Sequence, residues 1–529
     1  MKLYKKIFLS IGSAGLLVMG GCTKNFDSIN TDPTQVLQSQ FDPNLLMAST
    51  QVEYMNAIQG YNSGIIFESM WIQALASPAA NSYYSNGDKY TASPNTTSYQ
   101  GSLWNHTYNS AGYAAAILNG SNGKSGFGNL RAMATIMQVL DFQTCSDVYG
   151  DIPVSQAVQA PAITQPVYDA QSAIYPVLLA RLDSVLPKLN VDSPTTANDI
   201  FYKGDVTKWK KFGYSLMLRM AMRLVKVDAA NAQKYAEKAY AGGTFAGTAD
   251  DAYVTFDQSN NYNNNNAAAY QTGQDFLEVK WSKTVIDYLR TNSDPRLGVV
   301  AEVAQPGLKL AADESLAGDK TAANQLGVPN GYDNVANIPG YPGPTGTGDD
   351  AYPAGKYSRP SIDLYLSKNT PGYVINYAET ELLLAEAAVR GWNVGSAATH
   401  YANGLKAGMQ NLSVLSASKT GVADVDITTY VATHSLSVTP ATAITQINTQ
   451  YWIVTSTLFD FVEGWSNWRR SGFPALVPVN YPSNFSGGQI PRRQVYPATE
   501  ASNNPSGYSA AVGKLTGGDK FSGRVWWDK

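Results

Sequence analysis

The chain has 529 residues, of which 44% are hydrophobic and 15% are charged, so it can bury one large core or two linked ones. Its formal net charge at pH 7 is −3, and this balance argues against a surface that binds nucleic acid. Beyond the N-terminal residues, no segment offers the roughly 18 uninterrupted apolar residues that a membrane-spanning helix needs. The composition therefore predicts a large folded body in water.

The N-terminus predicts export and lipid attachment. Three lysines precede an apolar run over residues 7–20, and a run this short is typical of a secretory signal peptide. Cys22 directly follows the segment LVMGG, which matches the lipobox of bacterial lipoproteins. We therefore expect residues 1–21 to be removed and Cys22 to carry a lipid; an ordinary secreted protein with a chance cysteine is the less favoured alternative. Cys145 is the only other cysteine, so no intramolecular disulfide is expected.

Apolar periodicity predicts a mostly α-helical fold. From Ala378 to Val389, apolar residues recur at steps of four, three and four, which places them on one face of a helix spanning 373–391. The same pattern predicts helices at 44–60, 104–119, 130–145, 170–189, 206–227, 231–241, 397–411 and 443–462. Short turns join 206–227 to 231–241 and 373–391 to 397–411, as in tetratricopeptide-like hairpins, although no fixed repeat length is visible. We expect residues 22–529 to form one domain, an irregular stack of such hairpins with long inserted loops.

Aromatic side chains in polar loops are the candidate ligand contacts. The chain contains 33 Tyr against 16 Phe, and a Tyr or Trp ring combines an apolar face with a polar edge that suits sugar rings and peptide side chains. Long polar or Gly/Pro-rich stretches at 78–102, 253–275, 303–360 and 412–442 are the expected places for a site. The candidate rings, from 67–90 and 253–275, are Trp71, Tyr83, Tyr84, Tyr90, Tyr262 and Tyr270. The candidate polar contacts are Asn81, Asn86, Asp88, Gln271 and Gln274. Trp104 and Tyr108 lie four residues apart on a predicted helix and are expected in the core.

The sequence contains no recognisable catalytic or metal-binding motif. His106, His400 and His434 are the only histidines and are far apart, so no zinc-ligand spacing exists. We expect no cofactor, no metal and no enzymatic activity. Two alternatives stay open. The paired carboxylates of a glycoside hydrolase are close in space rather than in sequence, and a helical scaffold that recruits other proteins needs no motif at all.

Several segments in a fixed order carry a family resemblance. They are NFDSINTDP (25–33) soon after Cys22, LRAM (130–133) running through DVYGDIPV (147–154), YAETELLLAEA (377–387), FVEGWSNWRRSG (461–472) and PRRQVYPATE (491–500). Together they resemble the SusD/RagB family of nutrient-binding outer-membrane lipoproteins over essentially the whole mature chain. The final segment, GGDKFSGRVWWDK (517–529), is similar to the SusD-like branch of that family.

The resemblance implies a non-catalytic lid on a SusC-type TonB-dependent transporter. Such a lid captures an oligosaccharide or peptide at the cell surface and delivers it inward, and it reaches the outer membrane only through its lipid. We expect the arginines of the family motifs to hold buried carboxylates such as Glu463 and Glu500, not ligand. These arginines are Arg469, Arg470, Arg492 and Arg493.

Overall fold

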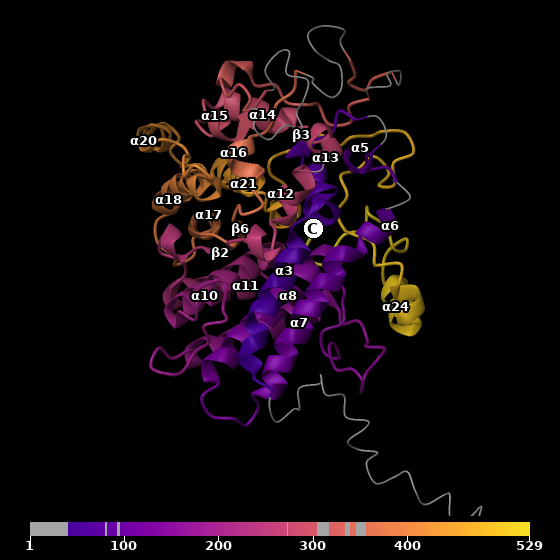
Figure 1. The fold of residues 1–529 in the computed structure, drawn as a ribbon, viewed down its shortest axis with the longest axis vertical. Helices are drawn as coiled ribbons and strands as arrows, with labels where there is room; N and C mark the ends of the chain where they lie inside the picture. The colour runs from indigo at the N-terminus through magenta and orange to yellow at the C-terminus, as the bar shows by residue number, and fades with distance from the viewer. Residues whose placement is uncertain are drawn as a thin grey trace, which may run out of the picture. The chain divides into compact units, whose positions relative to one another are not determined.

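The computed structural model describes residues 41–79, 82–92, 96–271, 273–303, 317–333, 339–344 and 356–529. Cys22 and the predicted signal peptide lie outside these residues. Asn44–Lys529 form one compact unit, whose described part is mostly helical (Figure 1). Within the described residues, no helix is both long and apolar enough to cross a membrane.

Every helix predicted from periodicity is present. They are α3 (Leu46–Ile58), α7 (Gly101–Gly120), α8 (Gly128–Tyr149), α9 (Gln171–Val185), α10 (Val206–Arg223), α11 (Ala229–Gly242), α17 (Tyr377–Val389), α18 (Ala397–Gln410) and α21 (Pro440–Thr457). The helix predicted over 443–462 runs past the end of α21 into the start of α22 (Phe461–Ser471), which the periodicity did not predict. The break falls at Phe459, whose φ of +58° lies in the left-handed region and ends the helical path.

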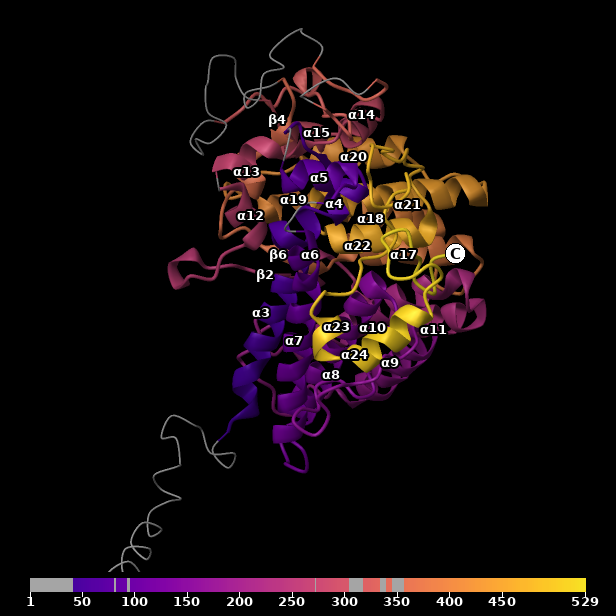
Figure 2. The ribbon, with the colours of Figure 1, turned by 90° about the vertical axis from the view of Figure 1, so that its right-hand side faces the viewer.

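Both predicted hairpins form: α10 packs against α11, and α17 packs against α18. Helices α3, α7 and α8 lie side by side in Figure 1, and α17, α18, α21 and α22 are grouped in Figure 2. Two glycines set the close approach of α18. A Cβ at Gly404 would lie 2.8 Å from Leu382 Cγ, and one at Gly408 would lie 2.5 Å from Val454 Cγ2. Larger residues at either position would push these helices apart.

Short elements lie between the long helices, and residues 373–375, predicted as the start of the helix over 373–391, form part of a strand instead. Three two-stranded antiparallel ladders join distant segments: β1 (Leu75–Ala76) with β3 (Lys280–Trp281), β2 (Ala252–Val254) with β6 (Gly372–Ile375), and β4 (Ala301–Glu302) with β5 (Arg359–Pro360). The short helices are α4 (Glu68–Trp71), α5 (Tyr83–Lys89), α6 (Thr96–Tyr99), α12 (Asn265–Tyr270), α13 (Gly273–Glu278), α14 (Lys283–Thr291), α15 (Leu297–Val300), α16 (Ile362–Tyr365), α19 (Leu412–Leu415), α20 (Asp424–Thr433), α23 (Glu500–Asn503) and α24 (Pro505–Gly513).

Buried arginines join the helices through carboxylates. Arg219 of α10 makes a two-point contact with Glu379 of α17, at 2.6 and 2.7 Å. One turn further along α10, Arg223 Nη2 donates to both oxygens of Glu463 on α22, at 2.7 and 2.6 Å. All four side chains are buried, so the charges of three helices neutralise one another inside the core.

Three of the four motif arginines hold a carboxylate as expected, although not Glu463 or Glu500, and Arg492 is only partly buried. Arg470 holds Glu386 of α17, Arg492 holds Asp528, and Arg493 holds Asp519. Within the described residues Arg469 makes no ion pair; its guanidinium lies over the Trp465 ring, 3.5 Å from the centroid, and over the Trp527 ring. Glu500 accepts a hydrogen bond of 2.6 Å from the Tyr168 hydroxyl. The sequence could not predict which carboxylate each arginine holds, because these carboxylates come from other segments of the chain.

Candidate binding site

Four of the six predicted ligand-binding rings are core side chains. Trp71, Tyr84 and Tyr90 are 0% exposed and Tyr270 is 2% exposed. The Trp71 ring packs on Trp465 at 5.1 Å between centroids. These segments were expected to be loops, but Trp71, Tyr84 and Tyr270 lie on α4, α5 and α12, and each helix turns one face to the core. We therefore do not carry these four rings into the candidate site.

The other two predicted rings are half-buried, and one of them lines a cavity. Tyr262 packs on Phe256 with 4.8 Å between centroids and lies outside that cavity. Tyr83, the first residue of α5, lines a cavity of about 470 Å³. Trp104 and Tyr108 pack together in the core region, as expected, with 4.9 Å between centroids.

We call this 470 Å³ space the tyrosine cavity. Its walls come from the end of α3 and the adjoining π-helical turn η2 (Tyr61–Ile65), from α5 and α7, and from α12 and α13. Helices α5, α12 and α13 are neighbours in both Figure 1 and Figure 2. The lining residues are Asn56, Gln59, Gly60, Tyr61, Asn62, Tyr83, His106, Asn265, Ala268, Ala269 and Asp275. The two stretches from which the sequence predicted a site thus meet at one cavity.

Three tyrosines form an edge-to-face cluster beside the cavity. The Tyr99 ring lies nearly perpendicular to both Tyr61 and Tyr83, with centroids 5.4 and 5.9 Å apart. Tyr61 and Tyr83 are 6.4 Å apart, and Tyr61 is 37% exposed. Packing of this kind fixes ring orientation while leaving ring surface at the cavity. Tyr61 was not predicted, because it follows directly on the helix predicted over 44–60; the positive φ of Gly60, 120°, redirects the chain just after α3 ends.

The asparagine run at the start of α12 builds one wall. Asn264 Oδ1 accepts from the Ala267 amide at 3.0 Å and caps the helix, while its Nδ2 donates to the Thr370 carbonyl at 2.8 Å. Asn265 Nδ2 donates to Asn56 Oδ1 at 3.0 Å, and Asn266 Oδ1 accepts from the Gly60 amide at 2.7 Å. This polar run, which reads as a loop, is therefore a set of caps and cross-links that hold α12 against α3 and η2.

The predicted polar contacts serve structural roles where the structure describes them. Asn86 accepts from the Thr91 hydroxyl, Asp88 accepts from Asn330 and from the Gly331 amide, and Gln271 donates to the Leu366 carbonyl. Asn81 and the side chain of Gln274 lie outside the described residues. The amides that line the cavity instead come from neighbouring positions on α3, η2 and α12.

Charge in the cavity is sparse. Within the described lining, Asp275 is the one carboxylate; it accepts a hydrogen bond of 2.9 Å from the Tyr84 hydroxyl, and burial raises its pKa to about 6. His106 Nδ1 lies 2.7 Å from Glu53 Oε2, and the described lining contains no lysine or arginine. Ring faces, amides and a single carboxylate suit a neutral ligand rich in hydroxyl groups.

Comparison with known proteins identifies the family. The model of a family described as "Starch-binding associating with outer membrane", SusD-like, matches residues 33–497. The chain belongs to the SusD-like family. No curated protein matches this SusD-like chain, but solved structures do. One described as a chitin-binding protein is 29% identical, with a TM-score of 0.78, and covers 92% of this chain and 100% of its own.

Two further solved structures agree with this SusD-like fold. A chitin-binding SusD homolog from Flavobacterium johnsoniae is 25% identical, with a TM-score of 0.71, and covers 91% of this chain and 98% of its own. A SusD-like protein from Bacteroides thetaiotaomicron is 26% identical, with a TM-score of 0.70, and covers 92% of this chain and 99% of its own. The mostly helical fold predicted from the sequence is confirmed.

Proposed function

We propose that this SusD-like protein captures an oligosaccharide at the cell surface and delivers it to a SusC-type TonB-dependent transporter, without catalysis. The family description supports a role in carbohydrate binding at the outer membrane. The observation that carries the proposal is the tyrosine cavity, where half-buried rings and amides line one preformed space. Attachment through a lipid on Cys22 and orientation toward the outside complete the proposal.

Chitin oligosaccharides are the ligand class we propose to test first. Two of the similar structures are described as chitin-binding, and an N-acetylglucosamine unit carries a neutral ring, hydroxyl groups and an amide. Tyr61 and Tyr83 would stack on the ring, while Asn56, Asn62 and Asn265 would pair with its polar groups. An acidic peptide is less well matched, since the described lining offers no lysine or arginine.

Calorimetric titration of chitin oligosaccharides into single-ring variants tests the site. Tyr61→Ala and Tyr83→Ala should each lower affinity by about tenfold to a hundredfold, or about 1–3 kcal/mol, with little change in melting temperature. Tyr113→Ala is the matched control, because Tyr113 on α7 is 39% exposed, close to the 37% of Tyr61, and lies outside the cavity. Unchanged affinity in both cavity variants would exclude the tyrosine cavity as the site.

Product analysis separates capture from the hydrolase alternative. Glycoside hydrolysis requires two carboxyl groups about 5–10 Å apart. The described lining contributes Asp275, and Glu53 lies behind His106. Mass spectrometry of the oligosaccharide after prolonged incubation should find it intact; shortened products would establish an enzyme. Co-purification with a transporter barrel from detergent-extracted membranes tests the delivery step, and purification without one would contradict it.

A further inference from the structure

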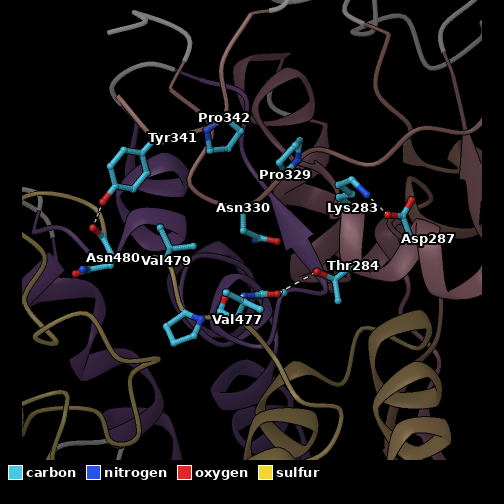
Figure 3. A pocket seen from close by; sticks show the side chains of 13 residues that line it. Lys283, Thr284, Asp287, Pro329, Asn330, Tyr341, Pro342, Val477, Val479 and Asn480 are labelled. Atoms are coloured by element: carbon cyan, nitrogen blue, oxygen red, sulfur yellow. Dashed lines mark hydrogen bonds and ion pairs between the residues drawn. The ribbon is translucent and has the colours of Figure 1, made fainter. Parts of the chain in front are cut away.

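A second cavity, of about 390 Å³, shares no lining residue with the tyrosine cavity (Figure 3). We call it the proline cavity, because Pro329, Pro342 and Pro478 line it. Its walls come from five separate parts of the chain: Gln73, α14 and residues 329–330, 340–342 and 477–480. Figure 3 shows Tyr341 and Pro342 on one side and Thr284 with Lys283 on the other.

Buried polar side chains fix the walls of the proline cavity. Gln73 is 5% exposed and bridges two of them: its Nε2 donates to the Val477 carbonyl at 2.5 Å, and its Oε1 accepts from the Thr284 hydroxyl at 3.0 Å. Its φ of +54° lies in the left-handed region, which a non-glycine residue adopts only where the surroundings enforce it. Asn330 is held in the same way, donating to Asp88 Oδ1 at 2.5 Å and to the Leu75 carbonyl at 3.0 Å. The cavity is therefore built before any ligand arrives.

The lining selects for a neutral ligand with apolar faces and polar edges. Lys283 and Asp287 pair across one turn of α14, so their charges cancel. Apart from this pair, the walls present proline and valine surfaces, the Tyr341 ring and the Asn480 amide. The Tyr341 ring is oriented by edge-to-face packing on Tyr481, with 5.0 Å between centroids, and its hydroxyl donates to the Asn480 carbonyl. These are the features that bind a pyranose ring.

We propose that the proline cavity is a second binding site for a short neutral saccharide segment. The choice of ligand class rests on the proposed function, whereas the site itself rests on Gln73, Asn330 and Tyr341. Its volume lies near the lower end of ligand pockets, about 300–1,000 Å³, which suits a short segment.

Helix α5 connects the two cavities. Tyr83 at its start lines the tyrosine cavity, and Asp88 near its end holds Asn330 of the proline cavity. At about 1.5 Å per residue, these two α5 positions are about 8 Å apart along the helix axis. A Cβ on Gly87 would lie 1.9 Å from the Ile66 carbonyl oxygen, so α5 packs directly on the neighbouring backbone and its two ends are held in fixed relation. A long glycan that occupies both sites gains affinity through effective concentration.

The test compares chitobiose with a long soluble chitin oligosaccharide by calorimetry. Wild type should bind two molecules of chitobiose, and Tyr341→Ala and Tyr83→Ala should each remove one of them. The long oligosaccharide should bind wild type at least tenfold more tightly than chitobiose, and each variant should lose this gain. Tyr113→Ala is the control that should retain both sites, and melting curves verify that every variant is folded.

The outcomes separate this inference from the proposed function. One chitobiose site that is lost in Tyr83→Ala and kept in Tyr341→Ala would overturn the second site and leave the proposed function intact. One site that is lost only in Tyr341→Ala would refute both the two-site arrangement and the assignment of the tyrosine cavity. Absence of saccharide binding to folded wild type would overturn both proposals.

Discussion

Glu386 allows a direct measurement of what a motif arginine contributes to stability, because two arginines hold it in different environments. Arg470 makes a two-point contact with it at 2.8 and 2.6 Å, and Arg390 contacts it at 3.0 and 2.6 Å. Arg470 and Glu386 are each 1% exposed, whereas the Arg390 side chain is 29% exposed. Burial acts to raise the pKa of Glu386, but the two arginines hold it well below its usual range.

Arg470→Ala should destabilise the protein far more than Arg390→Ala. Removing one partner of a buried ion pair costs about 3–5 kcal/mol, whereas a partly exposed pair contributes about 0–1 kcal/mol. Unfolding entropy of about 2.1 cal/mol/K per residue, applied to Asn44–Lys529, gives about 1 kcal/mol per degree. The melting temperature should therefore fall by about 3–5 °C in Arg470→Ala and by less than about 1 °C in Arg390→Ala.

Scanning calorimetry at neutral pH measures the melting temperatures of wild type and both variants. Repeating the measurement at lower pH tests whether the charge on Glu386 causes the difference. Because the folded-state pKa of Glu386 is depressed, its contribution is present above the unfolded pKa and is lost as pH falls below it. The difference in melting temperature between wild type and Arg470→Ala should therefore decrease as the pH is lowered. Equal small shifts in both variants would refute the argument that burial sets the energy of this pair. Loss of saccharide affinity without a change in melting would instead place Arg470 in a binding site.

Three further predictions test the anchor, the cavity carboxylate and a buried histidine. Radiolabelled fatty acid should enter wild type and not Cys22→Ser, and equal labelling would exclude the lipoprotein assignment. Since burial raises the pKa of Asp275 to about 6, saccharide affinity should weaken as pH falls below that value, and Asp275→Asn should remove this dependence. Burial acts to lower the pKa of His400, but its hydrogen bond to Glu381 raises it above the usual value, so this pairing stabilises the fold at low pH. Glu381→Gln should therefore lower the melting temperature more at about pH 5 than at about pH 9, and an equal effect at both would contradict the pairing.

Periodicity was sufficient to predict the long helices because each buries one regular stripe. The apolar stripe from Ala378 to Val389 predicts a helix in the sequence, and in the structure this helix, α17, packs against α18. Polar segments were harder. The asparagines at the start of α12 lack any apolar period, yet three of them cap or cross-link that helix, and side-chain hydrogen bonds of this kind leave no periodic signal.

The sequence could not tell which candidate rings are buried and which line the cavity, because that also depends on tertiary packing. Tyr83 and Tyr84 are adjacent, and composition gives them the same prediction, but successive residues of a helix point about 100° apart. Tyr84 therefore enters the core and bonds to Asp275, while Tyr83 faces the cavity. Choosing between them requires the direction of α5, which the contact of Gly87 with Ile66 sets. That contact is tertiary and has no counterpart in the local sequence.

The same rigidity bears on how the protein would bind. Both cavities are lined by short elements that side-chain hydrogen bonds already hold in place. Asn264 caps α12, and Gln73 bridges two walls of the proline cavity. A ligand entering such a site orders few side chains, so the entropy cost of immobilising the protein on binding is smaller. A neutral saccharide makes individually weak contacts, and a preformed site is the physical means by which rings such as Tyr61 and Tyr341 can still hold it. Gln73→Ala should therefore weaken chitobiose binding at the proline cavity, although the Gln73 side chain is hydrogen-bonded to the Val477 carbonyl and Thr284 and not to ligand. If a folded Gln73→Ala variant kept its chitobiose affinity at that cavity, preorganisation would contribute nothing there.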